Sequence, residues 1–313
     1  MRYIRPIEVT AARLVESNVP EDDAPAWSSA TTYQAGAVVR VSPYLYEALK
    51  ATTNEPPADN TEGSNPAWLR LDNLNRWRMF NRRIGSATVA SEPYDPEDYA
   101  VHPLDEPDGI AVAVAPGAPS DALAVLDVEA VHVDLIVETG DGVVFADRQL
   151  LGGELSVSDW WHWFFEPLQR RTEVAWFGLP LVSDATYRLS AFQPNTPARV
   201  GAVAIGRAVD VGQALVGTSV GIIDFSRKER DEFGGFDVVE RAFAREMEVE
   251  LAIHFSEITA VQRSLAAVRA VPVVWQASPL VDATLVYGFY RDFRITISSP
   301  TVCFGVITIE GLT

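Results

Sequence analysis

The sequence predicts a mainly β protein in which a small N-terminal β module is followed by β-sandwich-like domains with one or two short helices. The apolar runs are short, rich in valine and separated by turn residues, as at Val131–Val137 and Val200–Ile205. Thr186–Phe192 alternates between polar and apolar residues with the period of two that is typical of a strand. Strands of this kind favour antiparallel sandwiches over a parallel sheet.

The chain is long enough for several modules, because 313 residues with 48% hydrophobic side chains exceed what one ordinary core requires. Pro6, Pro20 and Pro25 punctuate its start, which we expect either to pack on a neighbouring subunit or to fray. We predict four segments: an extended N-terminal arm over residues 1–26, a small β module over 27–71, a β-sandwich domain over 72–212, and a C-terminal β-rich domain with one amphipathic helix over 213–313.

Turn residues and helical spacing define the elements within these segments. Two short strands, Ala37–Val41 and Tyr44–Leu49, lie on either side of Ser42-Pro43. Gly140-Asp141-Gly142 predicts a hairpin turn in the sandwich domain. In the last segment Ser256 is a candidate N-cap for one helix, whose apolar face would consist of Ile258, Val261, Leu265 and Val268.

The net charge is −18, from 25 basic and 43 acidic side chains, and we expect no nucleic-acid partner because phosphate binding requires a basic face. The acidity is uneven, since residues 92–159 hold sixteen acidic side chains and one basic one, Arg148. A solvated, self-repelling surface is the plainer interpretation. Ca²⁺ coordination by loop carboxylates is the alternative, although no EF-hand-like spacing supports it.

A single cysteine, Cys303, excludes an internal disulfide and fits folding in a reducing cytoplasm. Its apolar neighbours predict a core position. The N-terminus has no apolar segment typical of a signal peptide, and nowhere do eighteen apolar residues run together. We therefore expect neither a signal peptide nor a membrane span.

The sequence contains no recognisable catalytic pattern. None of the histidines is spaced like a metal ligand, and phosphate-binding, dinucleotide-binding and nucleophile-elbow motifs are missing. A pair of carboxylates for glycoside hydrolysis is supported only by the large number of acidic residues, and no spacing singles out such a pair. We expect His132, which lies within an apolar strand, to face outward or to be hydrogen-bonded. We therefore predict a non-enzymatic protein with no catalytic residue, no metal and no cofactor.

Aromatic residues are concentrated in the small module, at Trp27, Tyr33, Tyr44, Tyr46 and Trp68. In so small a unit they cannot all be buried, and exposed rings offer flat faces on which a pyranose can stack. Alternatively, they hold together a core that is too small to be stable without them. The residues alone leave both interpretations open.

A second aromatic cluster, Trp160-Trp161-His162-Trp163-Phe164-Phe165, lies in the sandwich domain. A helix turns by about 100° per residue and would spread these rings around its whole circumference. Because an exposed patch of that size is rare on a soluble monomer, we expect another subunit to cover part of it. Trp160, Trp161 and Phe165 are the predicted interface residues.

A series of residues runs through the small module over roughly 45 positions: Trp27, Tyr33-x-x-Gly36-x-x-Val39, Tyr46-x-Ala48, Pro56-Pro57 and Trp68. This series resembles the pattern of the chitin-binding carbohydrate modules found on chitinases, so we expect residues 27–71 to be a small carbohydrate-binding-like module. The resemblance implies that Trp27, Tyr33, Tyr46 and Trp68 contact sugar. The chain departs from the pattern after Ala48, where Leu49-Lys50-Ala51-Thr52 replaces the adjacent aromatic residues that those modules often carry.

Further segments of note are residues 75–80, which read NRWRMF, and residues 217–227, 231–234, 287–293 and 309–312. These segments are similar to ones that recur in tail proteins of siphophages and related prophages, and we expect residues 213–313 to be an assembly domain. This resemblance implies a tail-tip or baseplate protein of a tailed phage.

Taken together, these features predict a structural component of a phage tail tip or baseplate. We expect it to be located in the virion, after assembly in the host cytoplasm. Its expected partners are other tail and baseplate proteins, copies of itself around the tail axis, and a host surface glycan contacted through the small module. The alternative is a secreted carbohydrate-active enzyme, or a free lectin, with an appended chitin-binding-type module. The missing signal peptide and the small size of every module disfavour the enzyme.

Overall fold

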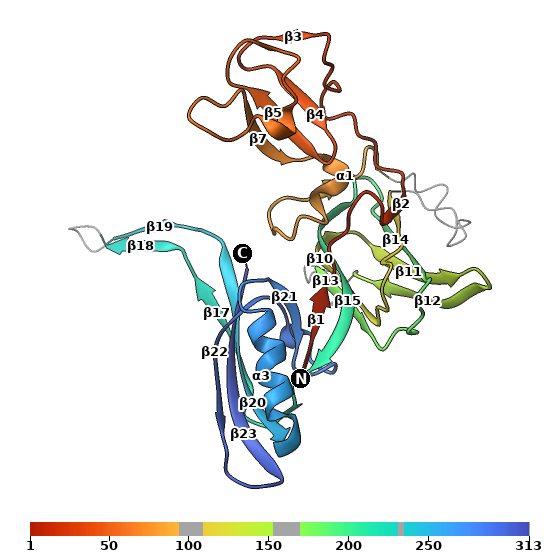
Figure 1. Cartoon of the computed structure of the whole chain (residues 1–313). Helices are drawn as coiled ribbons and strands as arrows, with labels where there is room; N and C mark the ends of the chain where they lie inside the picture. The colour runs from red at the N-terminus through yellow and green to blue at the C-terminus, as the bar shows by residue number, and fades with distance from the viewer. Residues whose placement is uncertain (94–108, 153–169, 231–234, 313) are drawn as a thin grey trace, which may run out of the picture.

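A computed structural model describes residues 1–93, 109–152, 170–230 and 235–312 (Figure 1). The chain is mainly β, as the sequence predicts, and its sheets are antiparallel. Figure 1 shows a small module at one end, a β-sandwich beneath it, and a C-terminal domain built on a curled sheet. No helix within the described ranges is long and apolar enough to cross a membrane.

The sandwich packs two sheets face to face around one apolar core. Side chains that alternate along the strands, such as Leu123, Val125, Val133 and Leu135, fill that core. The first sheet contains β8 (Thr88–Val89), β10 (Ala122–Glu129), β13 (Glu173–Phe177) and β15 (Arg199–Asp210), and the second runs in the order β12 (Gly142–Leu150), β11 (His132–Thr139), β14 (Thr186–Phe192), β9 (Ile110–Val114) and β2 (Leu14–Ser17). The predicted hairpin turn at residues 140–142 is confirmed, because it joins β11 to β12.

The C-terminal domain wraps a curled sheet around one helix, α3 (Ile258–Ala267). Val261 and Leu265 of α3 are buried against the strands, so the predicted amphipathic helix is confirmed. Ser256 is not its N-cap: it lies in the short helix η2 (Phe255–Glu257), and no side chain caps α3. The strands are β16 (Gln213–Ala214), β17 (Ser219–Asp224), β20 (Phe243–His254), β21 (Val273–Gln276), β22 (Leu285–Thr296) and β23 (Val302–Gly311), with η3 (Asp282–Thr284) before β22.

The N-terminal strand β1 (Arg2–Pro6) joins the two domains. It pairs with β15 on one side and β21 on the other, so the first sheet of the sandwich and the curled sheet of the C-terminal domain form one continuous sheet. Tyr3 packs into the core of the C-terminal domain, whereas Ile4 points to the opposite face, into a second apolar cluster. The expected arm over residues 1–26 is therefore wrong in its first part, because these residues are an internal strand rather than a free extension. Later in the same segment, β2 pairs with β9.

The small module has two small sheets of its own, one of two strands and one of three, separate from the sandwich. Its elements are β3 (Thr32–Tyr33), β4 (Val38–Val41), β5 (Tyr44–Ala48), β6 (Thr52–Thr53), η1 (Pro57–Asp59) and β7 (Trp68–Asn73). The short helix α1 (Asn75–Arg78) connects the module to the sandwich. The indole N–H of Trp77 donates to Glu21 at 2.9 Å and the guanidinium of Arg76 donates to the Val19 carbonyl at 2.6 Å. These bonds attach the connecting helix to residues that precede the module.

A long hairpin leaves the C-terminal domain. Its base is the pair β17–β20, and its outer part is the pair β18 (Arg227–Arg230) and β19 (Phe236–Val239). Figure 1 shows the β18–β19 end extending away from the cores. The described side chains of β18 and β19 are exposed, so this part of the hairpin has no core of its own.

Candidate functional site

The aromatic residues of the small module divide into a buried pair and a half-buried pair. Trp68 is 0% exposed and Tyr46 is 4% exposed, whereas Trp27 and Tyr33 are half-buried and pack against this core. The Trp68 indole donates to the carbonyl of Glu55 at 3.0 Å, and the ring of Tyr33 meets Trp68 edge-on at 5.4 Å between centroids. The aromatic residues therefore build the core of the module.

This burial corrects part of the predicted sugar-contact set. The rings of Tyr46 and Trp68 have no free face on which a pyranose can stack. Burial also raises the pKa of the Tyr46 hydroxyl. The alternation along β5 indicates that Tyr46 is buried, because Tyr46 shares a face of the strand with Ala48, a small residue that is 1% exposed.

Trp27 and Tyr33 keep part of their surface. The hydroxyl of Tyr33 accepts a hydrogen bond from the backbone N–H of Ser28 at 2.8 Å. The indole N–H of Trp27 is buried and makes no hydrogen bond to any other described residue. A buried donor without a hydrogen bond costs free energy, so a ligand atom that accepts a hydrogen bond from it is bound more favourably. Of the four predicted positions, Trp27 and Tyr33 are the two that this structure leaves able to contact a ligand.

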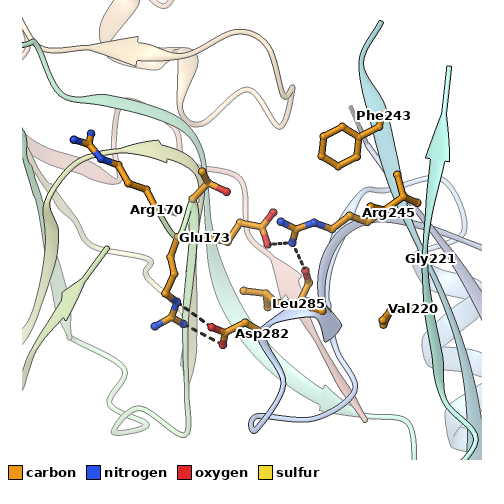
Figure 2. Close-up of a pocket in the computed structure, with 12 residues that line it drawn as sticks. Arg170, Glu173, Val220, Gly221, Phe243, Arg245, Asp282 and Leu285 are labelled. Carbon is orange, nitrogen blue, oxygen red and sulfur yellow. Dashed lines mark hydrogen bonds and ion pairs between the residues drawn. The ribbon is translucent and has the colours of Figure 1, made fainter. Parts of the chain in front are cut away.

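The predicted interface residues Trp160, Trp161 and Phe165 lie outside the described residues. The chain is described again from Arg170 onward, and there it borders a pocket of about 420 Å³ (Figure 2). One wall is the base of the hairpin, with Val220, Ile222 and Phe243, and the other consists of residues 170–173 and 282–285. The pocket lies where the two ends of the continuous sheet that runs through both domains approach each other. In that sheet β13 is one edge strand, and β20 lies near the other edge.

An ion pair crosses this pocket. Arg245 of β20 donates to the carboxylate of Glu173 at 2.7 Å and to the Leu285 carbonyl at 3.3 Å, and Arg171 donates to Asp282 at 3.2 Å. Figure 2 shows the Glu173 and Arg245 side chains pointing toward each other. Burial raises the pKa of the Glu173 carboxyl, while Arg245 opposes that shift. A perturbed carboxyl in a pocket is a common sign of a functional site. Here Arg245 binds the carboxylate, so the pair acts as a link between β13 and β20.

His132 is buried rather than outward-facing, which corrects one alternative of the sequence interpretation. It is 3% exposed, stacks on Phe192 at 4.6 Å, and its Nε2 lies 3.7 Å from Asp134, which Arg148 also contacts at 2.7 Å. Burial lowers the pKa of the imidazole. The predicted core position of Cys303 is confirmed, at 0% exposed. Within residues 1–93, 109–152, 170–230 and 235–312, no group of three or more histidine, cysteine or acidic side chains is placed to hold a metal ion.

The exposed apolar residues of the hairpin form the second notable surface. Val220, Ile222 and Phe243 at its base are 47%, 70% and 54% exposed, and further out Phe225, Val238 and Val239 are also exposed. Among the described strands β17 pairs with β20 alone, so its outer edge presents unpaired backbone groups. The chemistry of this surface suits burial against another protein.

No family model matches the chain, and no curated protein matches it significantly.

Proposed function

We propose that this chain is a structural subunit of the tip or baseplate of a phage tail and that it assembles through the β17–β20 hairpin. The observation that carries the proposal is the exposed apolar surface of the hairpin, at Val220, Ile222 and Phe243. The rest of the described residues leave these side chains exposed, and exposed apolar patches of this kind mark contact surfaces between proteins. A neighbouring subunit that covers them supplies the missing core.

Ion pairs within the hairpin support the same interpretation. Residues 219–243 carry six acidic and four basic side chains, in a chain whose net charge is −18. Lys228 pairs with Asp224 and Arg227 with Glu229, both at 2.6 Å. Basic side chains that neutralise neighbouring carboxylates reduce the repulsion between the acidic surfaces of two subunits.

In this proposal the small module projects from the particle and contacts a host surface glycan. Its own sheets and its own aromatic core let it stand apart from the sandwich, to which α1 connects it. Trp27 and Tyr33 are its remaining candidates for direct contact. The competing candidates, a secreted enzyme and a free lectin, would each leave the hairpin without a partner.

The test measures assembly and location together. The triple variant Val220→Ser, Ile222→Ser and Phe243→Ser should stay folded but shift the solution mass toward the monomer, as light scattering would measure. A control variant, Val15→Ser with Leu181→Ser, removes apolar residues that are also exposed, at 62% and 55%, but lie outside the hairpin. Antibodies against the protein should label one end of the tail on particles from cells that produce it. A monomeric wild-type protein that is missing from particles would refute the proposal.

A further inference from the structure

A polar groove lies where the small module meets the sandwich, away from the pocket of Figure 2. Its volume is about 660 Å³, within the range of small-ligand sites. The module contributes Pro43, Tyr44 and residues 70–73, and the opposite side consists of residues 8–11, Trp77 of α1, and residues 80–83, which follow α1. Figure 1 shows this junction, with α1 between the module and the sandwich.

Three arginines line the groove. None of these arginines, Arg70, Arg82 and Arg83, makes an ion pair with a described residue. Of the two carboxylates in the lining, Asp72 is held by Arg78 at 3.6 Å and by the hydroxyl of Ser86 at 3.3 Å, while Glu8 is exposed. Uncompensated positive charge in a concave site attracts anions, and here it stands out against a net charge of −18.

The backbone holds two of these arginines in place. Arg82 adopts a left-handed conformation with φ of 62°, and its carbonyl oxygen accepts a hydrogen bond from the hydroxyl of Tyr287 at 3.1 Å. The backbone N–H of Arg83 donates to the side chain of Asn81 at 2.8 Å. This turn is anchored to the C-terminal domain, so the guanidinium groups start from a fixed backbone. Guanidinium groups suit carboxylate and phosphate oxygens, which they bind through paired hydrogen bonds.

Ring faces and an amide complete the lining. Tyr44 and Phe80 are half-buried, and the guanidinium of Arg70 lies 4.8 Å from the centroid of the Tyr44 ring. The side-chain amide of Asn73 makes no hydrogen bond to any other described residue, and it can serve both donors and acceptors of a ligand. Rings beside amides and guanidinium groups match a sugar ring that carries hydroxyl and acidic substituents.

We propose that this groove binds a saccharide bearing carboxylate or phosphate groups. The choice of a saccharide rests on the proposed function, in which the module faces a host surface, whereas the affinity for anions rests on the three arginines alone. The site is distinct from the aromatic core that the sequence singles out, because Tyr46 and Trp68 take no part in the lining.

The experiment uses the full-length protein and calorimetric titration at low salt. The probes are oligogalacturonate, its uncharged methyl ester, and a phosphomannan fragment. The variant is Arg70→Gln with Arg82→Gln and Arg83→Gln, which removes the charge and keeps a polar side chain at each position. The control is Arg263→Gln, at an exposed arginine of α3 that lies far from the groove in sequence and on another element.

We expect the wild type and the Arg263 control to bind oligogalacturonate or phosphomannan but not the methyl ester. The triple variant should bind about tenfold more weakly or worse, at an unchanged melting temperature, since that loss corresponds to one charge-assisted hydrogen bond. Preference for one acidic probe identifies the substituent. The proposal is overturned if neither acidic probe binds, if the triple variant binds as the wild type does, or if polyglutamate competes as well as the sugars. Tail labelling is measured separately, so its failure is distinguishable from loss of sugar binding.

Discussion

The guanidinium of Arg245 on β20 lies 2.7 Å from the carboxylate of Glu173 on β13, and this contact joins two strands from distant positions in one continuous sheet. The side chains of Glu173 and Arg245 are 21% and 37% exposed, so neither is fully solvated. Removing only the cation leaves a largely desolvated carboxylate. We expect Arg245→Leu to lower the free energy of unfolding by about 1–3 kcal/mol. Chemical denaturation at neutral pH measures this, and an unchanged midpoint would show that the pair contributes nothing.

The pH dependence of stability should report on the same carboxyl. Burial holds the pKa of Glu173 above its ordinary value of 4.5, although Arg245 opposes the shift. The folded state therefore holds this proton more tightly than the unfolded chain does. The resulting stability is fully present below pH 4.5 and is lost as the pH rises through the raised pKa. Glu173→Gln should flatten this part of the stability profile, whereas Glu248→Gln, at an exposed position on β20, should leave it unchanged.

Tyr46 and Tyr44 should respond differently to truncation. Tyr46 is 4% exposed in the core of the small module, so Tyr46→Ala should cost about 3–5 kcal/mol and unfold the module. Tyr44 is half-buried in the groove lining, and Tyr44→Ala should lower sugar affinity with a smaller loss of stability. Thermal unfolding of the full chain, followed by tryptophan fluorescence, separates the two. Equal losses of stability would contradict the assignment of Tyr44 to the groove.

Gly206 allows β1 to approach β15. A Cβ at this position would lie 1.9 Å from the carbonyl oxygen of Arg5, so Gly206→Ala must displace one of the two strands. We expect a loss of about 1–3 kcal/mol and, in differential scanning calorimetry, separation of the sandwich and C-terminal transitions. Gly221→Ala is the matched control, since the nearest heavy atom to its Cβ is 4.0 Å away. A single unshifted transition in both variants would show that β1 does not couple the domains.

Catalysis gives a further test. Because the sequence contains no recognisable catalytic pattern, the purified protein should release no reducing ends from peptidoglycan, chitin or host polysaccharide. Release above the level of a heat-treated control, abolished by Glu173→Gln, would instead assign an enzymatic role to the pocket of Figure 2.

Local signals in the sequence predicted much of the fold. Strand alternation at Thr186–Phe192 and helical spacing at Ile258–Val268 are confirmed because each pattern directly marks the face that becomes buried. The strand at Arg2–Pro6 escaped prediction for the opposite reason. Both of its faces are buried, so it shows no alternation, and its partners come from residues far along the chain.

The groove was not predicted, because it depends on how the module sits on the sandwich. Tyr44 belongs to the module, whereas Arg82 and Arg83 follow α1, and no sequence pattern places these residues together. The charge imbalance could have drawn attention to it, since adjacent arginines are conspicuous in a chain of net charge −18. Which arginines lack an acidic partner depends on tertiary structure.

The position of β1 also constrains when the protein can finish folding. A ribosome makes residues 2–6 long before their partners at 206–210 and 274–276. Until then, the apolar side chains of Tyr3 and Ile4 have no sheet to join. Long-range pairing of this kind slows folding and leaves unpaired apolar strands exposed to aggregation during synthesis. A chain that stalls before residue 273 would lack both the second partner of β1 and the β21–β22 pair, and would present an open sheet edge to the cell's proteases.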